Sequence, residues 1–256
     1  MFRRALAATT LQECHMFTVD QFVDDLEPIF DAVHQRSERD FILSLFHIVN
    51  SPELERVLRE SGNAPITSQF RFNLTPKSLH SVTNLSAYTN YLDAQGQSPE
   101  FLVMYSKLYA YLQVLETKYI YKVLGNFLRV LLNQPPDGTL YDELHSGHQC
   151  FSRLVALHDE LVAGGIQFAL FEKWTTFMDR SLRNCIAHND LNMHAASRTI
   201  LLPSLLLRQI THPAEAPDIR GVYTFDDVID YYVSATNFTE AFKCVVSRTI
   251  DLGDRY

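Results

Sequence analysis

The sequence predicts an all-α protein: a helical bundle with an additional N-terminal helical region and a short β-hairpin before the last helix. Three observations support this class. Apolar residues recur every three or four positions over long stretches, which is the period of an amphipathic helix. The 256 residues include only nine glycines, so few breakers interrupt these stretches. Capping residues mark several helix starts.

Length and composition bound the organisation of the chain. With 256 residues, of which 46% are hydrophobic, the chain can bury one full core. We expect a main helical domain over residues 99–256 and an N-terminal helical region over residues 1–98. The apolar stretches are shorter than the roughly 20 residues that cross a bilayer, so no membrane partner is expected. Four widely scattered cysteines favour a reducing compartment, which predicts a cytoplasmic location.

Capping and breaking signals predict three helices in the N-terminal region. Residues 18–21 form a capping box for a first helix that runs to about His34. A second helix is expected over residues 38–49, and a third, with a Ser-Pro-Glu start and a Gly-Asn-Ala-Pro stop, over residues 51–62. Residues 66–97 are rich in Ser, Thr and Asn, which indicates a long excursion with short helical pieces.

Longer helices are predicted in the second part of the chain. Residues 98–100, Ser-Pro-Glu, begin a central long helix over residues 101–132. A Pro-Pro-Asp-Gly loop follows at residues 135–138. The next helix is expected over residues 141–163, because the glycine pair at residues 164–165 ends it.

The helix after this glycine pair, from about Gln167 onward, is amphipathic. Its apolar stripe consists of Phe171, Trp174, Met178, Leu182, Cys185 and Ile186. The opposite side, at about 100° per residue, presents Arg180, Asn184, Ala187 and His188. We therefore expect the polar side chains of this helix to face away from the core.

A short hairpin and a final helix complete the predicted fold. Residues 198–202 and 220–223 are compatible with two strands that pair across a proline-containing loop. Residues 224–227, Thr-Phe-Asp-Asp, cap a last helix that runs to about Thr249.

The run Arg183-Asn184-Cys185-Ile186-Ala187-His188 is the candidate site. Arginine is a permanent cation that can hold a phosphate, and histidine exchanges protons near neutral pH. The bare spacing is uninformative, since an Arg followed five positions later by His is expected roughly 0.6 times by chance, and Arg153 and His158 share it. Requiring Asn directly after the Arg lowers the expectation to about 0.03. Only Arg183 meets this condition.

This run, preceded by an amphipathic helix and followed by a short hairpin and a Thr-capped final helix, resembles the signature of the HEPN superfamily. That signature consists of Arg, a polar residue and, after a short spacer, His. The resemblance covers roughly residues 99–250. It implies a HEPN-like helical bundle and, as in many members, a metal-independent endoribonuclease of prokaryotic defence or toxin–antitoxin systems. An antitoxin or sensor protein would then be a regulatory partner.

The resemblance also implies catalytic roles for Arg183, Asn184 and His188. The imidazole of His188 would exchange protons with the ribose 2′-hydroxyl or the leaving 5′-oxygen of RNA. Arg183 would stabilise charge on the phosphorus, and Asn184 would orient the phosphate or the imidazole. Cleavage would leave a 2′,3′-cyclic phosphate and a 5′-hydroxyl, with no metal or other cofactor. Because one histidine cannot easily be both base and acid, the resemblance implies a homodimer with facing motifs.

Helix geometry leaves alternatives open for the motif. Five residues on an ideal helix rotate Arg183 about 140° away from His188, whereas Asn184 and His188 stack one turn apart. Arg183 must then curl around, the helix must be irregular, or Arg180 must supply the charge instead. The alternative without catalysis makes Arg183 a solvated residue and His188 a C-terminal cap, with Asn189 ending the helix.

Two other groups of residues are candidate sites. Lys118, Lys122 and Arg129 fall near one face of the central helix, and they either bind RNA phosphate, together with Arg180, or form an ordinary solvated face. Residues 145–150, His-Ser-Gly-His-Gln-Cys, offer zinc ligands. Since no paired Cys-x-x-Cys accompanies them, we predict no metal site and interpret them as a loop that starts a helix.

The central helix carries further polar residues with two interpretations each. Glu116 either positions Arg183 across the bundle or is a surface carboxylate. A group of tyrosines either forms a dimer interface or packs within the monomer. These tyrosines are Tyr105, Tyr109, Tyr111, Tyr119 and Tyr121.

The net charge of −8 argues against a broad nonspecific nucleic-acid surface, because phosphate contacts supply the affinity of such binding. Any RNA contact must therefore be local or supplied by a partner. The acidity supports an alternative function, a noncatalytic HEPN-like module that binds RNA, a nucleotide or a protein. A helical scaffold in which the motif is a coincidence is the third hypothesis.

Overall fold

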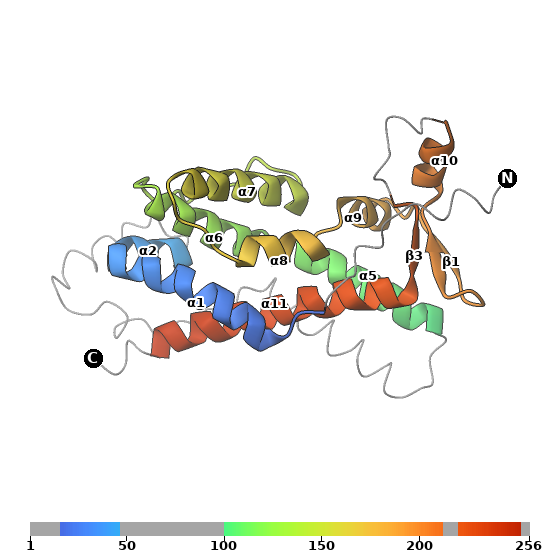
Figure 1. The fold of residues 1–256 in the computed structure, drawn as a ribbon, viewed down its shortest axis with the longest axis horizontal. Coiled ribbons are helices and arrows are strands. Elements are labelled where there is room, and N and C mark those ends of the chain that lie inside the picture. The colour runs from blue at the N-terminus through green and yellow to red at the C-terminus, as the bar shows by residue number, and fades with distance from the viewer. Residues whose placement is uncertain (1–15, 47–99, 212–219, 252–256) are drawn as a thin grey trace.

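The computed structural model describes residues 16–46, 100–211 and 220–251, and these residues are mostly helical (Figure 1). The all-α prediction is confirmed at this level. The helices are α1 (Val19–Arg36), α2 (Glu38–Phe46), α5 (Glu100–Leu115), α6 (Lys118–Leu131), α7 (Gly147–Ala163), α8 (Leu170–Phe177), α9 (Arg180–Ala187), α10 (Pro203–Thr211) and α11 (Phe225–Asp251). The strands are β1 (Asn192–His194), β2 (Thr199–Leu201) and β3 (Val222–Thr224).

The long helix α11 organises the bundle. It packs against α1, α5 and α8, while α6 packs against α1, α2 and α7. Figure 1 shows α11 running along the bundle, with α9, α10 and the strands at one end. No helix among the described residues is long and apolar enough to cross a membrane.

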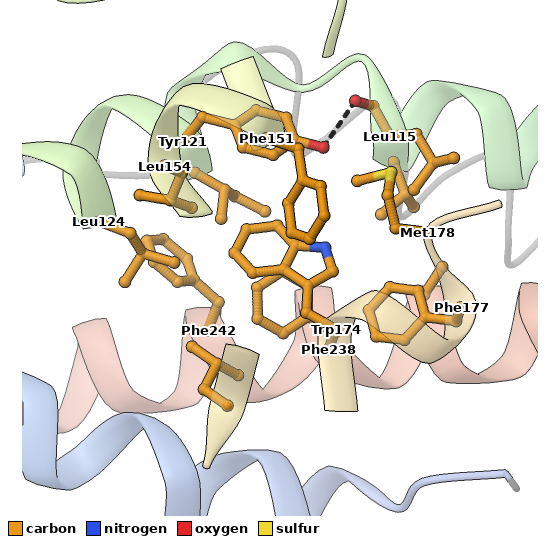
Figure 2. Packing of buried hydrophobic residues seen from close by; sticks show 14 of the residues in the cluster. Leu115, Tyr121, Leu124, Phe151, Leu154, Trp174, Phe177, Met178, Phe238 and Phe242 are labelled. Atoms are coloured by element: carbon orange, nitrogen blue, oxygen red, sulfur yellow. Dashed lines mark hydrogen bonds between the residues drawn. The ribbon is translucent and has the colours of Figure 1, made fainter. Parts of the chain in front are cut away.

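A cluster of aromatic side chains forms the centre of the core (Figure 2). Trp174 is only 2% exposed, and its ring stacks on Tyr121 at 5.3 Å and contacts Phe238 at 4.5 Å between centroids. The buried hydroxyl of Tyr121 donates to the carbonyl of Leu115 at 2.9 Å. This bond satisfies a polar group that would otherwise destabilise the core.

The first expected helix is confirmed. The side chains and backbones of Thr18 and Gln21 form the capping box that starts α1. α1 and α2 contribute side chains to the same buried cluster as α6 and α11, among them Phe30 and Phe41. The described part of the N-terminal region thus shares its core with the rest, while the division at residue 98 stays a prediction. The expected third helix and the excursion over residues 66–97 lie outside the described residues.

The expectation of one central helix over residues 101–132 is wrong, because two helices, α5 and α6, meet at Glu116 and Thr117. Thr117 has a ψ of 86°, and its hydroxyl donates back to the carbonyl of Gln113 at 2.7 Å. The start of α7 lies against the end of α5, so that a Cβ atom on Gly147 would come within 1.6 Å of the carbonyl oxygen of Leu115. Tertiary packing, rather than a breaker in the sequence, therefore ends α5.

The next helix also begins later than expected, at Gly147 instead of residue 141. Tyr141 has a φ of 67°, a left-handed conformation that is costly inside a right-handed helix. The side chain of Ser146 accepts a hydrogen bond from the backbone of Gln149 and so caps the start of α7. The predicted end at the glycine pair is confirmed, with Gly165 at a φ of 88°.

The helix expected from Gln167 onward is in fact two helices, α8 and α9. Met178 leaves the helical conformation with a ψ of 70°, and the side chain of Asp179 then caps α9 by accepting from the backbone of Leu182. The interpretation of the apolar stripe is confirmed, because every member is buried. These residues are Phe171, Trp174, Met178, Leu182, Cys185 and Ile186.

The predicted hairpin is confirmed as the antiparallel pair β2 and β3, with Thr199 opposite Thr224. The structure adds β1 on the other side of β2 and α10 between β2 and β3. Strands of three residues are too short for an alternating pattern to reveal. Thr224 starts α11 as expected, since its hydroxyl accepts from the backbone of Asp227 at 3.1 Å.

Candidate functional site

The motif lies on α9, a helix of eight residues, whose start is fixed by buried hydroxyl groups. Asp179 accepts from the backbone of Leu182 through Oδ1 at 2.9 Å and from the hydroxyl of Tyr223 through Oδ2 at 2.6 Å. The Tyr111 hydroxyl accepts from the backbone of Asp179 at 3.0 Å and donates to the carbonyl of Phe177 at 2.6 Å. Burial, followed by the neighbouring Asp179 carboxylate, raises the pKa of both tyrosines, so both remain protonated donors.

The guanidinium of Arg183 is directed into the bundle, toward Glu116 at the junction of α5 and α6. Arg183 Nε donates to Glu116 Oε1 at 2.6 Å, and Nη2 forms an ion pair with the same oxygen. Arg183 Nη1 donates to Asn184 Oδ1 at 2.8 Å. The second carboxylate oxygen of Glu116 accepts from the backbone of Gly147 at 2.9 Å. Of the two interpretations of Glu116, the structure therefore places its carboxylate against Arg183 across the bundle, linking α9 to α5 and α7.

These contacts leave part of the guanidinium able to bind an anion. Arginine has five N–H groups, and the bonds to Glu116 and Asn184 occupy three of them. One N–H on each terminal nitrogen has no partner among the described residues. The Arg183 side chain is 13% exposed and that of Glu116 is 27% exposed. Arg180 is exposed at the start of α9 and makes no ion pair with the part of the chain that the structure describes.

His188 lies at the other end of α9 and is exposed. It is the C-terminal cap, and Asn189, with a φ of 54°, ends the helix. The backbone of Asn189 donates to Ile186 and that of Asp190 to Cys185, the bond pair of a Schellman motif. The expected capping role is therefore present, and it uses only the backbone. The imidazole makes no hydrogen bond with the described residues, so it remains available to a substrate.

His148 lies on the first turn of α7, directly after Gly147, which binds the carboxylate of Glu116. The sequence interpretation of the motif did not include this histidine. Its pKa is lowered by burial and by the guanidinium groups of Arg180 and Arg183, against an opposing effect of Glu116. Its Nδ1 atom is buried and has no hydrogen-bond partner in the described part of the chain. The sequence offered one signal for the location of His148: it stands two residues after Ser146, the N-cap residue, and therefore at the start of a helix.

The zinc interpretation of residues 145–150 gains no support from the geometry. Cys150 is fully buried, and burial raises the pKa of its thiol to about 11. Zinc binds the thiolate, so this environment disfavours the form that would ligate. Within residues 16–46, 100–211 and 220–251, no group of three His, Cys, Asp or Glu side chains could hold a metal ion.

The basic residues of α6 contact the loop that precedes α7. Lys118 Nζ donates to the carbonyls of Tyr141 and Leu144, and Lys122 forms an ion pair with Asp142. Arg129, on the same helix, donates to a carbonyl of this loop at 3.1 Å. An RNA phosphate would have to compete with these partners for Lys118 and Lys122.

The tyrosines of α5 and α6 divide by burial. Tyr111 and Tyr121 are core residues, Tyr105 and Tyr119 are half-buried, and only Tyr109 among the five is exposed, at 43%. Packing within the monomer therefore accounts for most of this tyrosine content. Of these tyrosines, Tyr109 is the most available to a dimer interface, together with Phe101, which is 42% exposed on the same helix.

Comparisons of this chain with protein-family models, with curated proteins and with solved structures find no match. Any functional assignment therefore depends on the residues of the site.

Proposed function

We propose that this protein is a HEPN-like, metal-independent endoribonuclease that acts in prokaryotic defence or a toxin–antitoxin system. One observation carries the proposal: a short surface helix holds an oriented arginine, an asparagine in contact with it and an exposed histidine one turn further on. Arg183 is held by Glu116 yet keeps two N–H groups for a phosphate. This combination supplies a fixed cation and a proton-exchanging group, which RNA cleavage without a metal requires.

The proposed reaction is a transesterification within RNA. The ribose 2′-oxygen attacks the adjacent phosphorus and loses its proton to a base, while the bond to the 5′-oxygen breaks and that oxygen receives a proton from an acid. Arg183 stabilises the added negative charge on the phosphate oxygens, because its charge and position are already fixed before the reaction. Asn184 holds the guanidinium through its side-chain oxygen. His188 protonates the leaving 5′-oxygen.

We further propose that the enzyme acts as a homodimer and that an antitoxin or sensor protein regulates it. The end of the bundle that carries α9 also carries α10, whose Leu207 and Ile210 side chains are 61% and 70% exposed. These exposed apolar side chains at the same end of the bundle favour association with a protein surface there.

A second candidate, a noncatalytic HEPN-like module that binds RNA, a nucleotide or a protein, is favoured by the pairing of Arg183 with Glu116. A carboxylate within hydrogen-bond distance offsets much of the positive charge that a phosphate would feel. The net charge of −8 acts in the same direction. A module of this kind would bind its ligand without cleaving RNA.

The decisive experiment incubates the full chain with total cellular RNA and excess chelator at pH 6–8. We expect fragments with 5′-hydroxyl ends, and we expect His188→Ala to cleave at least about 100-fold more slowly, the size of effect typical for loss of an acid or base. Arg183→Ala should lose about 100-fold or more. Two variants are matched controls. His194→Ala removes another exposed histidine, and Arg153→Ala removes an exposed arginine that also precedes a histidine by five positions.

Both controls should cleave at the wild-type rate. Equal cleavage by wild type and His188→Ala would reject the proposed site, because a contaminating nuclease would then account for the fragments. Absence of cleavage by the wild type, together with saturable binding of a nucleotide or RNA, would favour the noncatalytic module.

A further inference from the structure

His148 lies beside the arginine of the motif although 35 residues separate them in the chain. The residue before it, Gly147, donates its backbone N–H to Glu116 Oε2, and the other oxygen of this carboxylate binds Arg183. The charged groups that act on the His148 ring are Glu116 at the end of α5 and Arg180 and Arg183 on α9. His148, Glu116 and both arginines therefore form one cluster.

The ring of His148 differs from that of a structural histidine. His158, on the same helix, accepts from the backbone of Phe168 through Nε2 at 3.2 Å and stacks on Phe171 at 4.1 Å between centroids, so its tautomer is fixed. His148 Nδ1 is buried and unpartnered among the described residues. Buried polar atoms are nearly always paired, and an exception calls for an explanation such as catalysis.

The surroundings of His148 favour its neutral form. Burial penalises the imidazolium, and two guanidinium groups repel it more than the one carboxylate attracts it, so the pKa lies below its ordinary value. At neutral pH the ring therefore carries a lone pair, and because Nδ1 is closed to solvent, Nε2 is the atom that can accept a proton from a substrate. His188, by contrast, is exposed at the opposite end of α9.

The two histidines belong to different elements, His148 to the start of α7 and His188 to the end of α9. His148 follows Gly147, whose N–H binds the Glu116 carboxylate that also binds Arg183, so it belongs to the side of the site formed by α7 and Glu116. His188 is the C-terminal cap, about 7–8 Å beyond Arg183 along the axis at 1.5 Å per residue. One protomer thus carries two imidazoles with different surroundings on the elements that hold Arg183.

We infer that His148 is the general base of this site and that one protomer supplies both proton-transfer groups, His148 as base and His188 as acid. This inference rests on the proposed endoribonuclease function. The 2′-hydroxyl proton passes to the Nε2 lone pair of His148 as the 2′-oxygen bonds to phosphorus. The bond from phosphorus to the 5′-oxygen breaks, and that oxygen takes a proton from the His188 imidazolium. The products are the 2′,3′-cyclic phosphate and the 5′-hydroxyl, and no other reactant is consumed.

The test compares pH–rate profiles of the full-length wild type, His148→Gln and His188→Gln on one RNA substrate with chelator present. We expect kcat/KM of His148→Gln to fall at least about 100-fold at pH 7. Its profile should also lose the acidic limb, which reports protonation of the base, whereas His188→Gln should lose the alkaline limb. His145→Gln, in the exposed loop before α7, is the matched control and should keep both limbs.

A measurement on the wild type covers the case in which His148→Gln does not fold. With ¹³C-labelled histidine, the ring resonances of His148 and His188 should both shift on titration with 3′-uridine monophosphate, and that of His158 should not. An active His148→Gln with both limbs intact would overturn the inference and leave the proposed nuclease standing, with the base supplied across the dimer. A His148 resonance that ignores the nucleotide would do the same. A wild type that cleaves no RNA would overturn both proposals.

Discussion

Replacing Glu116 by alanine removes a carboxylate that connects the end of α5 to α7 and α9. Its two oxygens accept from Arg183 and from the backbone of Gly147. A hydrogen bond that involves a charged group contributes about 1.5–3 kcal/mol to stability. The pair is partly exposed, with 13% and 27% of the two side chains accessible, so solvent weakens its Coulombic part. We therefore expect the free energy of unfolding to fall by about 2 kcal/mol.

The assay is equilibrium unfolding in urea, followed by far-UV circular dichroism and tryptophan fluorescence. Trp174 is the only tryptophan and lies in the core, so fluorescence reports the packing that surrounds α8. For a chain of this size, each kcal/mol corresponds to roughly 2–4 °C in Tm, which predicts a decrease of about 4–8 °C. Glu160→Ala, an exposed carboxylate on α7, should change stability by less than about 0.5 kcal/mol.

A double-mutant cycle isolates the contact itself. Glu116→Ala, Arg183→Ala and the double variant should give a coupling energy of about 1–2 kcal/mol. A coupling near zero, with Glu116→Ala as stable as Glu160→Ala, would refute the reasoning that this contact holds α9 to the bundle. The same Glu116→Ala variant should cleave RNA more slowly, because the released guanidinium is no longer oriented before the reaction.

Three further predictions follow from the geometry around α9. Gly147→Ala should destabilise the protein by about 1–3 kcal/mol in urea unfolding, because its Cβ would overlap the last carbonyl of α5. Tyr223→Phe should cost about 1–2 kcal/mol in the same assay, because Asp179 loses a buried donor. Stability should fall from pH 7.5 to pH 5.5, with a slope of at most about 1.4 kcal/mol per pH unit for each of His148 and His158.

The sign of the pH effect follows from the two lowered pKa values. Burial lowers the pKa of both His148 and His158 in the folded protein, so the unfolded chain binds more protons below about pH 7. Their contribution is present above the unfolded pKa and is lost as the pH falls toward the folded values. His148→Gln should flatten the profile of stability against pH, and an unchanged slope would contradict the assignment.

Gly164→Ala, where the nearest atom is 3.2 Å from the new Cβ, is the control for Gly147→Ala. Equal losses of stability in the two variants would contradict the overlap argument.

Local signals in the sequence predicted the parts of the fold that local forces determine. The capping box at Thr18, the glycine pair that ends α7 and the cap at Thr224 are confirmed, because each depends on residues within one turn. The buried stripe around Trp174 is confirmed as well, since amphipathic spacing reports which face meets the core. All-α class and the β2–β3 pairing follow from the same kinds of signal.

The errors lie where contacts distant in sequence decide the backbone. Nothing near Thr117 breaks a helix by composition, and the junction of α5 and α6 exists because the start of α7 packs there. Tyr141 carries a positive φ although no sequence rule favours it at an aromatic residue. The strand β1 is three residues long, so it offers no period to recognise.

In the candidate site, too, local sequence predicts some features and contacts distant in sequence determine the others. The contacts of Arg183 show how α9 accommodates a motif whose side chains an ideal helix would separate. On an ideal helix, five residues rotate the Cβ of Arg183 about 140° from that of His188, so the two side chains leave the helix on different faces. In the structure, Arg183 points to Glu116 and one of its terminal nitrogens, Nη1, lies beside Asn184, whereas His188 is the cap at which the helix ends. The motif therefore depends on a partner carboxylate 67 residues earlier as much as on its own spacing. Sequence spacing could nominate the arginine and the histidine, but the groups that orient and complete them, Glu116 and His148, become apparent only when α5, α7 and α9 are assembled.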